Sequence, residues 1–216
     1  MRIKFMTVLA LSGCLTGLGL SRPAEAQLVN GSFESGNFVF DSQGADSLPA
    51  GSTAITGWTT INAEIAVITT PNNFSIVAPD GTKSLDLTGF HDSVPYGGIR
   101  QSVNTVAGQN YDLSFFIGSS FNTTSIAVDT GGAPTTFTNP GDGTFNFKQY
   151  TYNFTATGPS VITLLGTVAS TGNYIGLDKV ALTPRGSVAG TPEPGSVALF
   201  AGMALSGGIL LKRRRK

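Results

Sequence analysis

The chain has 216 residues and carries 13 basic and 13 acidic side chains, a formal net charge of zero at neutral pH. The charge is unevenly spread, because residues 27–183 hold four basic and 11 acidic side chains, a net charge of −7. This stretch is a poor partner for nucleic acid, since phosphate binding needs a basic surface. Calcium, neutral sugars or plain solubility suit an acidic domain better.

The N-terminal segment, residues 1–26, has the pattern of a secretory signal peptide. Arg2 and Lys4 precede an apolar stretch, and Ala24-Glu25-Ala26 fits a small-x-small cleavage pattern that leaves Gln27 as the mature N-terminus. We therefore expect export through the Sec pathway, with the mature chain starting in the periplasm.

An alternative for this segment is lipidation at Cys14, because Leu11-Ser12-Gly13-Cys14 also fits a lipoprotein box. Cleavage there would leave an apolar piece, residues 15–20, directly after the lipidated cysteine. Cys14 is the only cysteine of the chain, so cleavage after Ala26 leaves none. The mature protein would then have neither a disulfide framework nor a catalytic thiol.

Residues 27–183 are predicted to form one domain, because they are long enough to bury a real core. They are rich in Gly, Thr, Ser and Asn and show no sustained helical periodicity. Turn signals such as Pro79-Asp80-Gly81 and Gly158-Pro159 separate alternating apolar runs. The predicted strands are 63–69, 84–88, 98–106, 110–119, 125–129, 144–156, 160–167 and 174–183. This spacing predicts an all-β fold, a single antiparallel β-sandwich and most simply a jelly roll.

Alternation also predicts which side chains share a face of a strand. One strand places four apolar side chains on one face, and another places three aromatic side chains together. These are Tyr111, Leu113, Phe115 and Ile117 in the first strand, and Tyr150, Tyr152 and Phe154 in the second. Trp58, after Gly57, is predicted to be a core anchor rather than a binding platform.

The order of short motifs narrows the fold further. Asn30-Gly31-Ser32-Phe33-Glu34 opens the domain, Asp80-Gly81-Thr82-Lys83-Ser84-Leu85-Asp86-Leu87 lies in its middle, and Ile175-Gly176-Leu177-Asp178-Lys179-Val180 closes it. In this order the motifs resemble galactose-binding-like jelly rolls, including bacterial carbohydrate-binding modules and a plant cell-wall family, over nearly all of residues 28–183. The resemblance implies the fold more firmly than the ligand, because one fold hosts many functions.

The same resemblance implies a structural calcium ion held by Glu34 and Asp178. The first and last strands of such folds are often neighbours, and similar modules bind calcium there through an early acid, a late acid and backbone carbonyls. Calcium accepts flexible, oxygen-only coordination. The alternative is two separate surface carboxylates that cap turns.

The loop from Gly89 to Gly98 supplies the candidate ligand-binding residues Phe90, His91 and Tyr96. Exposed aromatic rings can stack on the apolar face of a sugar while neighbouring polar groups bond its hydroxyls. The alternative is that Phe90 and Tyr96 pack against the edge of the core and His91 is solvated.

No catalytic residue is predicted, and the chain is expected not to be an enzyme. The chain has one histidine and no Gly-x-Ser-x-Gly elbow, so a Ser-His-Asp triad finds no support. A pair of carboxylates for glycoside hydrolysis stays open, because their separation is not visible in a sequence.

The C-terminal part begins with a Pro/Gly/Ser linker at residues 184–191, followed by Pro192-Glu193-Pro194. Residues 196–211 form a predicted transmembrane helix, and the tail at residues 212–216 is entirely basic. The uncharged part would span about 22 Å as a helix, against about 30 Å for the hydrocarbon core, and the basic side chains can snorkel. The basic tail places the C-terminus in the cytoplasm. The alternative is a buried globular helix with a solvated tail.

This C-terminal segment, residues 192–216, resembles the PEP-CTERM sorting signal of Gram-negative bacteria. The Pro192-Glu193-Pro194 triplet, the glycine-containing apolar stretch and the Arg-rich end occur in the required order. The resemblance implies insertion in the inner membrane and removal of the tail by an exosortase. Proteins with this signal are linked with exopolysaccharide and biofilm matrix.

The sequence therefore favours an exported, non-catalytic surface or extracellular-matrix protein that contacts exopolysaccharide or envelope glycans. One alternative is a purely structural matrix or spacer protein without sugar affinity. A second alternative is a glycoside-processing enzyme.

Overall fold

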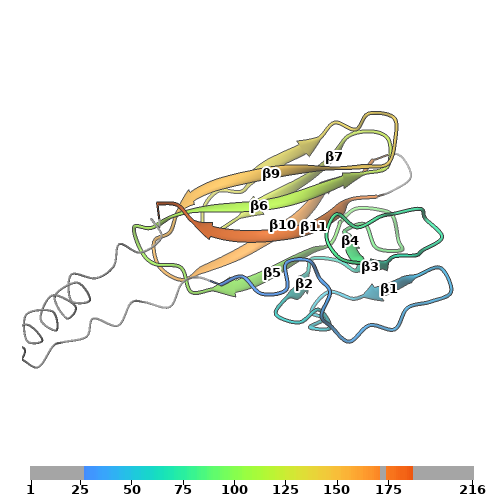
Figure 1. Ribbon diagram of the computed structural model, residues 1–216, viewed down its shortest axis with the longest axis horizontal. Helices are drawn as coiled ribbons and strands as arrows, with labels where there is room; N and C mark the ends of the chain where they lie inside the picture. Colours follow the sequence, from blue (N-terminus) through green and yellow to red (C-terminus); the bar gives the residue numbers. More distant parts are fainter. Residues whose placement is uncertain (1–26, 171–173, 187–216) are drawn as a thin grey trace, which may run out of the picture.

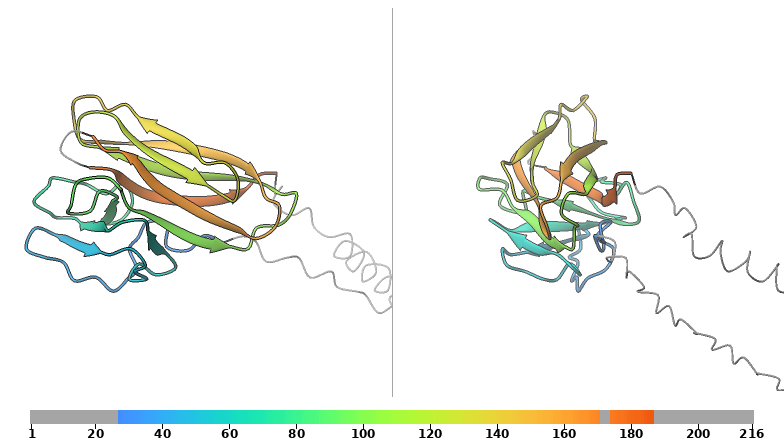
Figure 2. Two further views of the ribbon diagram at one scale, coloured as in Figure 1. Left: turned by 180° about the vertical axis from the view of Figure 1, so that it is seen from behind. Right: turned by 90° about the vertical axis from the view of Figure 1, so that its left-hand side faces the viewer.

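The computed structural model describes residues 27–170 and 174–186, and all regular structure in this part of the chain is β-strand. Six strands form one sheet, in the order β1 (Ala45–Leu48), β3 (Ile65–Thr69), β4 (Lys83–Asp86), β11 (Gly176–Pro184), β6 (Asn110–Ser119) and β9 (Asn146–Thr155). Five strands form the other, in the order β2 (Thr59–Ile61), β5 (Gly98–Val103), β10 (Ser160–Val168), β7 (Thr124–Asp129) and β8 (Thr135–Asn139). Every neighbouring pair is antiparallel. The two layers are visible in Figure 1 and, seen from one end, in Figure 2.

The core between the sheets is built by the alternation that the sequence predicts. Leu113, Phe115 and Ile117 of β6 are fully buried, and the ring of Phe115 packs edge-on against Phe137 of β8 at 5.3 Å between centroids. Burying each large apolar side chain contributes about 1.5–3 kcal/mol. The prediction of a single antiparallel β-sandwich is confirmed for the described residues.

Three strands are absent from the sequence prediction, namely β1, β2 and β8. All three are short and consist largely of Thr, Ser, Asp and Asn, so their own side chains carry almost no apolar alternation. They form because a longer neighbour offers backbone partners, as β7 does for β8 over the pairs from Thr124–Asn139 to Val128–Thr135.

Trp58 is a core residue, as predicted. It is 2% exposed, its ring meets Phe33 edge-on at 5.7 Å, and its indole N–H donates to the carbonyl oxygen of Asn30 at 3.0 Å. This bond ties the first turn of the domain to the interior.

Strand β11 fixes the polarity of the sandwich. It begins at Gly176, beside the end of β4, and ends at Pro184, beside the start of β6. Figure 1 accordingly shows residue 186 and residue 27 at one end of the sandwich, and the β4–β5 and β6–β7 loops at the other.

Several predicted segments lie outside the described residues. They are the signal peptide at 1–26 with Cys14, most of the linker at 184–191, the Pro192-Glu193-Pro194 motif, the transmembrane helix at 196–211 and the basic tail at 212–216. Within residues 27–170 and 174–186, no helix has the length and apolarity needed to cross a membrane.

Candidate functional site

The outer face of the six-stranded sheet carries a second apolar cluster, separate from the core. Ile65 and Val67 of β3 point into the core, whereas Ala66 and Ile68 between and beyond them join the outer cluster with Tyr174. Cross-strand pairs share a face, so a row of outer-face positions runs across five strands. Its members, from β3 to β9, are Ala66, Asp86, Gly176, Gly118 and Phe147.

A cavity of about 850 Å³ lies beside this row, and Asp86 is the member of the row that lines it. Its walls come from the segment before β1, the β3–β4, β4–β5 and β6–β7 loops, and the residues just before β9 and β11. The side chains that matter for its chemistry are Asp41, Gln43, Phe74, Asp86, Phe90, Asp92, Phe121, Phe145 and Tyr174. The volume falls within the range of about 300–1,000 Å³ of ligand pockets in proteins.

Asp86 is the buried acid of the cavity, 9% exposed. One of its oxygens, Oδ1, accepts bonds from the N–H of Thr88 at 3.0 Å, the hydroxyl of Thr88 at 2.8 Å and the N–H of Ile175 at 3.1 Å. Burial raises the pKa of Asp86 to about 7 although these donors lower it, and the nearby charge of Asp92 adds to the rise. The carboxyl group is therefore held rigidly and titrates near neutral pH.

Tyr174 packs beside the cavity because Gly176 has no side chain and leaves room for it. A Cβ atom on Gly176 would lie 2.6 Å from the Tyr174 hydroxyl oxygen and 2.6 Å from the Cα of Gly118. Tyr174 is 4% exposed and packs against Phe145 at 4.9 Å between ring centroids. Its hydroxyl lies beside the hydroxyl of the fully buried Ser84. Burial, together with the charge of Asp86, raises the pKa of Tyr174 above its ordinary value.

Exposed aromatic rings line the rim. Phe74, Phe90 and Phe121 are 41%, 52% and 54% exposed, and all three line the cavity. Across residues 27–170 and 174–186, these are the only aromatic side chains among the exposed large hydrophobic residues. Exposed apolar groups gathered around one hollow mark an interaction site.

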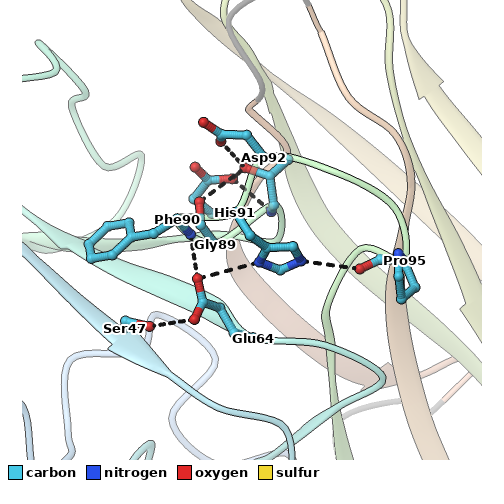
Figure 3. Close-up of polar contacts among 9 residues, drawn as sticks. Ser47, Glu64, Gly89, Phe90, His91, Asp92 and Pro95 are labelled. Carbon is cyan, nitrogen blue, oxygen red and sulfur yellow. Dashed lines mark hydrogen bonds and ion pairs between the residues drawn. The ribbon is translucent and has the colours of Figure 1, made fainter.

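Glu64 holds the β4–β5 loop in place, as Figure 3 shows. Its Oε1 accepts the N–H of Phe90 at 2.6 Å, and its Oε2 accepts the Ser47 hydroxyl at 2.9 Å. Burial opposes ionisation, but the bonds from Phe90, Ser47 and His91 keep the pKa of Glu64 below its ordinary value. Gly89 has φ +64°, and a Cβ there would lie 2.5 Å from Glu64, so the loop needs glycine at this position.

The three predicted ligand-binding residues have different surroundings. Phe90 lines the cavity, and Figure 3 shows its ring pointing away from the Glu64 cluster. The His91 ring lies between Glu64 Oε1, 3.4 Å from Nδ1, and the carbonyl oxygen of Pro95, 3.5 Å from Nε2. Tyr96 is half-buried against the core. Neither His91 nor Tyr96 belongs to the cavity lining.

The one histidine is not arranged as the base of a serine nucleophile. Ser47 and His91 contact different oxygens of Glu64, so the carboxylate lies between them. A triad requires the histidine to bond the serine hydroxyl directly.

Glu34 and Asp178, the predicted calcium ligands, meet at the same turn. Glu34 accepts the N–H groups of Thr82 and Lys83, both at 2.7 Å, while Asp178 accepts the N–H of Asp80 at 3.0 Å. Asp178 is fully buried. Burial raises its pKa to about 7, and the charges of Asp80 and Glu34 add to the rise despite backbone donors.

In this arrangement Lys83 lies beside Glu34, on the side where a calcium ion would bind. The second oxygen of Glu34 accepts the Thr82 hydroxyl at 2.8 Å and pairs with Lys83 Nζ at 3.3 Å, so a protein cation already occupies this side. No group of three or more His, Cys, Asp or Glu side chains able to hold a metal occurs in the ranges the structure describes. Calcium at Glu34 and Asp178 stays a prediction, and it requires Lys83 to move away.

Most of the cavity residues were not predicted from the sequence. Phe74 and Phe121 share one signal, since each is a single phenylalanine inside a segment of mostly Asn, Ser and Thr, whereas Phe145 is followed closely by Phe147. Asp86 carries another, as a lone acid between Leu85 and Leu87 in a strand. The sequence does not show that these loops meet at one end of one sheet.

Three solved structures are similar in fold. A CBM61 module in complex with β-1,4-galactotriose has a TM-score of 0.41 at 19% identity, over 74% of this chain and 99% of the module. A CBM4 module gives 0.36 at 18%, over 72% and 98%. An arabinose-bound α-L-arabinofuranosidase gives 0.44 at 21%, over 74% of this chain and 26% of the enzyme. At these identities and TM-scores the likeness bears on neither ligand nor activity.

No curated protein matches this chain. The profile of one family, described as a protein of unknown function, DUF642, matches residues 26–172. This region contains all of the sandwich except the last strand, β11. The chain therefore belongs to the DUF642 family.

Proposed function

We propose that this protein is an exported, non-catalytic glycan-binding protein whose outer-face cavity binds a sugar unit of an exopolysaccharide or another envelope glycan. The observation that carries the proposal is the gathering of Phe74, Phe90 and Phe121, the exposed aromatic rings of the described residues, around one cavity. Such rings cover the apolar face of a sugar, and the polar groups of the same cavity accept bonds from its hydroxyls.

The position of the cavity supports a role at a surface. β11 starts beside the cavity at Gly176 and leaves at Pro184, at the opposite end of the sandwich. A chain held in a membrane through the predicted helix at 196–211 would present the cavity away from that membrane. The same geometry suits a protein released by an exosortase and retained in the matrix through its ligand.

Binding is tested with the full-length protein, purified in a detergent without a sugar headgroup, on a glycan array followed by calorimetry. We expect Phe90→Ala to weaken binding of the best glycan about five- to tenfold, equivalent to about 1–1.5 kcal/mol for a lost aromatic contact. The control is Val161→Ala on β10, which removes an exposed apolar side chain outside the cavity. Absence of binding to every glycan would favour the spacer alternative.

The enzyme alternative has one specific observation in its favour. The Thr88 hydroxyl bridges Asp86 Oδ1 and Asp92 Oδ1 at 2.8 and 3.4 Å, so two carboxyl groups share one end of the cavity. Glycosidases use two such groups, one of them with a raised pKa. Release of sugar from the bound glycan that disappears in Asp86→Asn would replace the binding proposal with this one.

The sorting proposal rests on the Pro192-Glu193-Pro194 motif, the apolar stretch and the basic tail, and is tested separately. Replacing the triplet with alanines should leave the full-length chain in the inner membrane of a host that has an exosortase. Unchanged processing of the altered chain would overturn it. Replacing Thr191 alone is the matched control and should leave processing intact.

A further inference from the structure

The charged side chains among the described residues that line the cavity are all acidic. Three acids, Asp41, Asp86 and Asp92, line it, and none of its described lining residues is Lys, Arg or His. An acidic sugar would meet acidic side chains and no basic one among these residues. Such juxtaposition is unfavourable and gives strong negative selection between ligands.

The aromatic walls are suited to the same sign of charge. Five aromatic side chains line the cavity together with the three acids, namely Phe74, Phe90, Phe121, Phe145 and Tyr174. The face of an aromatic ring attracts a cation placed within about 6 Å of its centroid, and the attraction grows when water is excluded. Rings and carboxylates together favour an ammonium group, whereas a neutral hydroxyl gains little from the rings' charge distribution.

The buried acid of the cavity has no basic partner among the described lining residues. Tyr174 is 4% exposed and lines the cavity beside Asp86, and its hydroxyl lies next to the hydroxyl of the fully buried Ser84. Asp86 beside them has all of its donors on Oδ1, and no basic side chain of the lining neutralises it. Buried charges are nearly always paired in proteins, so a buried acid without a basic neighbour favours a cationic ligand.

On these grounds, and resting on the proposed glycan-binding function, we infer that the cavity selects a sugar carrying a free amino group, and that Asp86 is the counter-ion of that ammonium group. The ammonium donates three hydrogen bonds and accepts none, whereas carboxylates accept and do not donate. N-acetylation removes the charge, and a uronic acid reverses it. The preferred polymer is therefore a de-N-acetylated hexosamine polysaccharide.

The test compares three oligosaccharides of equal length on the full-length protein by calorimetry: a glucosamine tetramer, an N-acetylglucosamine tetramer and a galacturonic acid tetramer. We expect the glucosamine tetramer to bind at least tenfold more tightly than the N-acetylated one, and the acidic tetramer not to bind. Raising the salt from 50 to 300 mM should weaken the glucosamine tetramer and leave the N-acetylated one within twofold.

Two variants locate the effect. Asp86→Asn keeps the shape of the side chain, and its Oδ1 can still accept the bonds from Thr88 and Ile175. It should weaken the glucosamine tetramer at least tenfold, and it should weaken the N-acetylated tetramer by a smaller factor, so that the preference between the two is lost. Asp129→Asn removes the same charge from the β7–β8 turn, where the side chain accepts the N–H groups of Gly131 and Gly132 outside the cavity. This control should change neither affinity by more than twofold.

The outcomes separate the inference from the function on which it rests. Equal or tighter binding of the N-acetylated tetramer, with Phe90→Ala weakening it, overturns the amino-sugar inference and leaves the glycan-binding function standing. A preference for the glucosamine tetramer that survives in Asp86→Asn overturns the role of Asp86. Absence of binding to all three tetramers and to the glycan array overturns both.

Discussion

The two faces of the six-stranded sheet follow opposite rules although they are made by the same strands. On the inner face, Leu85, Phe115 and Leu177 are fully buried and apolar. On the outer face, the neighbouring positions are Asp86, a buried acid, and Gly176, which has no side chain and leaves room for Tyr174. The inner face stabilises the fold through burial of apolar side chains. On the outer face, a polar side chain is buried while aromatic rings are exposed to solvent. Such departures from ordinary packing are expected where a protein binds something.

The largest effect is expected from breaking the inner face. Phe115→Ala removes a fully buried ring that contacts Phe137 and Tyr150, and should lower the free energy of unfolding by about 3–5 kcal/mol. Urea unfolding measures this change. The matched change on the outer face, Phe90→Ala, removes a ring that is 52% exposed and should cost under about 0.5 kcal/mol. Similar losses for both would show that the outer rings are structural.

The second prediction concerns pH and the buried acids of the outer face. The folded state raises the pKa of Asp86 from 3.8 to about 7, mainly through burial, so it binds this proton more tightly than the unfolded chain does. The free energy of unfolding should therefore be highest at low pH and fall as pH rises to about 7, on the order of 2–4 kcal/mol for this group. Thermal unfolding between pH 5 and 7.5 measures the slope.

Asp86→Asn has no proton to lose and should flatten part of this pH dependence. Asp178, whose pKa burial also raises to about 7, should supply the remainder, so the double variant with Asp178→Asn should be nearly flat. Below this range Glu34 and Glu64 act with the opposite sign, because their pKa values are lowered. A steeper slope in Asp86→Asn than in the parent would contradict the assignment.

The sequence predicts the inner face of this sheet better than the outer face. Tyr111, Leu113, Phe115 and Ile117 were predicted to share a face because a period of two is visible in β6 alone, and the structure buries all four. Its bounds, Asn110–Ser119, are also those predicted.

Most of the cavity residues could not be predicted by the same reasoning. It depends on bringing the loops around Phe74, Phe90 and Phe121 to one end of the sheet, which follows from strand order and not from any local pattern. Phe90 was predicted because its loop also contains a histidine and a tyrosine. His91 and Tyr96 were chosen on the same local ground, yet Glu64 and the core hold them elsewhere. A local motif names residue types but not the partner that fixes their direction.

A smaller effect is expected at Gly176, which leaves room for Tyr174. Gly176→Ala would place a methyl group 2.6 Å from the Tyr174 hydroxyl oxygen and 2.6 Å from the Cα of Gly118. Overpacking of this kind costs about 1–3 kcal/mol, and tilting the tyrosine should also narrow the cavity and weaken glycan binding. Gly132→Ala, with no atom within 4 Å of the added methyl, is the control. A Gly176→Ala variant that binds normally would show that the position of Tyr174 is not needed for binding.

The smallest effect, about 1 kcal/mol, is expected for calcium at the second polar cluster of the domain. Lys83 Nζ sits 3.3 Å from Glu34 Oε2, so calcium must compete with it, and the ion should raise the unfolding temperature only slightly at 1 mM. Lys83→Met removes the competitor and should enlarge the increase, since stabilisation follows RT ln(1 + [L]/Kd). Glu34→Gln and Asp178→Asn should abolish it, with EDTA-treated protein as the reference.

The Lys83→Met variant decides between the two roles of this turn. If calcium stabilises it, Glu34 and Asp178 form a metal site that the lysine partly blocks in the parent chain. If calcium leaves it unchanged, Glu34 is a clamp for the backbone of Thr82 and Lys83, whose N–H groups lie 2.7 Å from its Oε1. In that case the cavity would remain as the candidate ligand site on the outer face of the described sheet. The binding role of this face would then belong to the region around Asp86, and the turn of Glu34 and Asp178 would be structural.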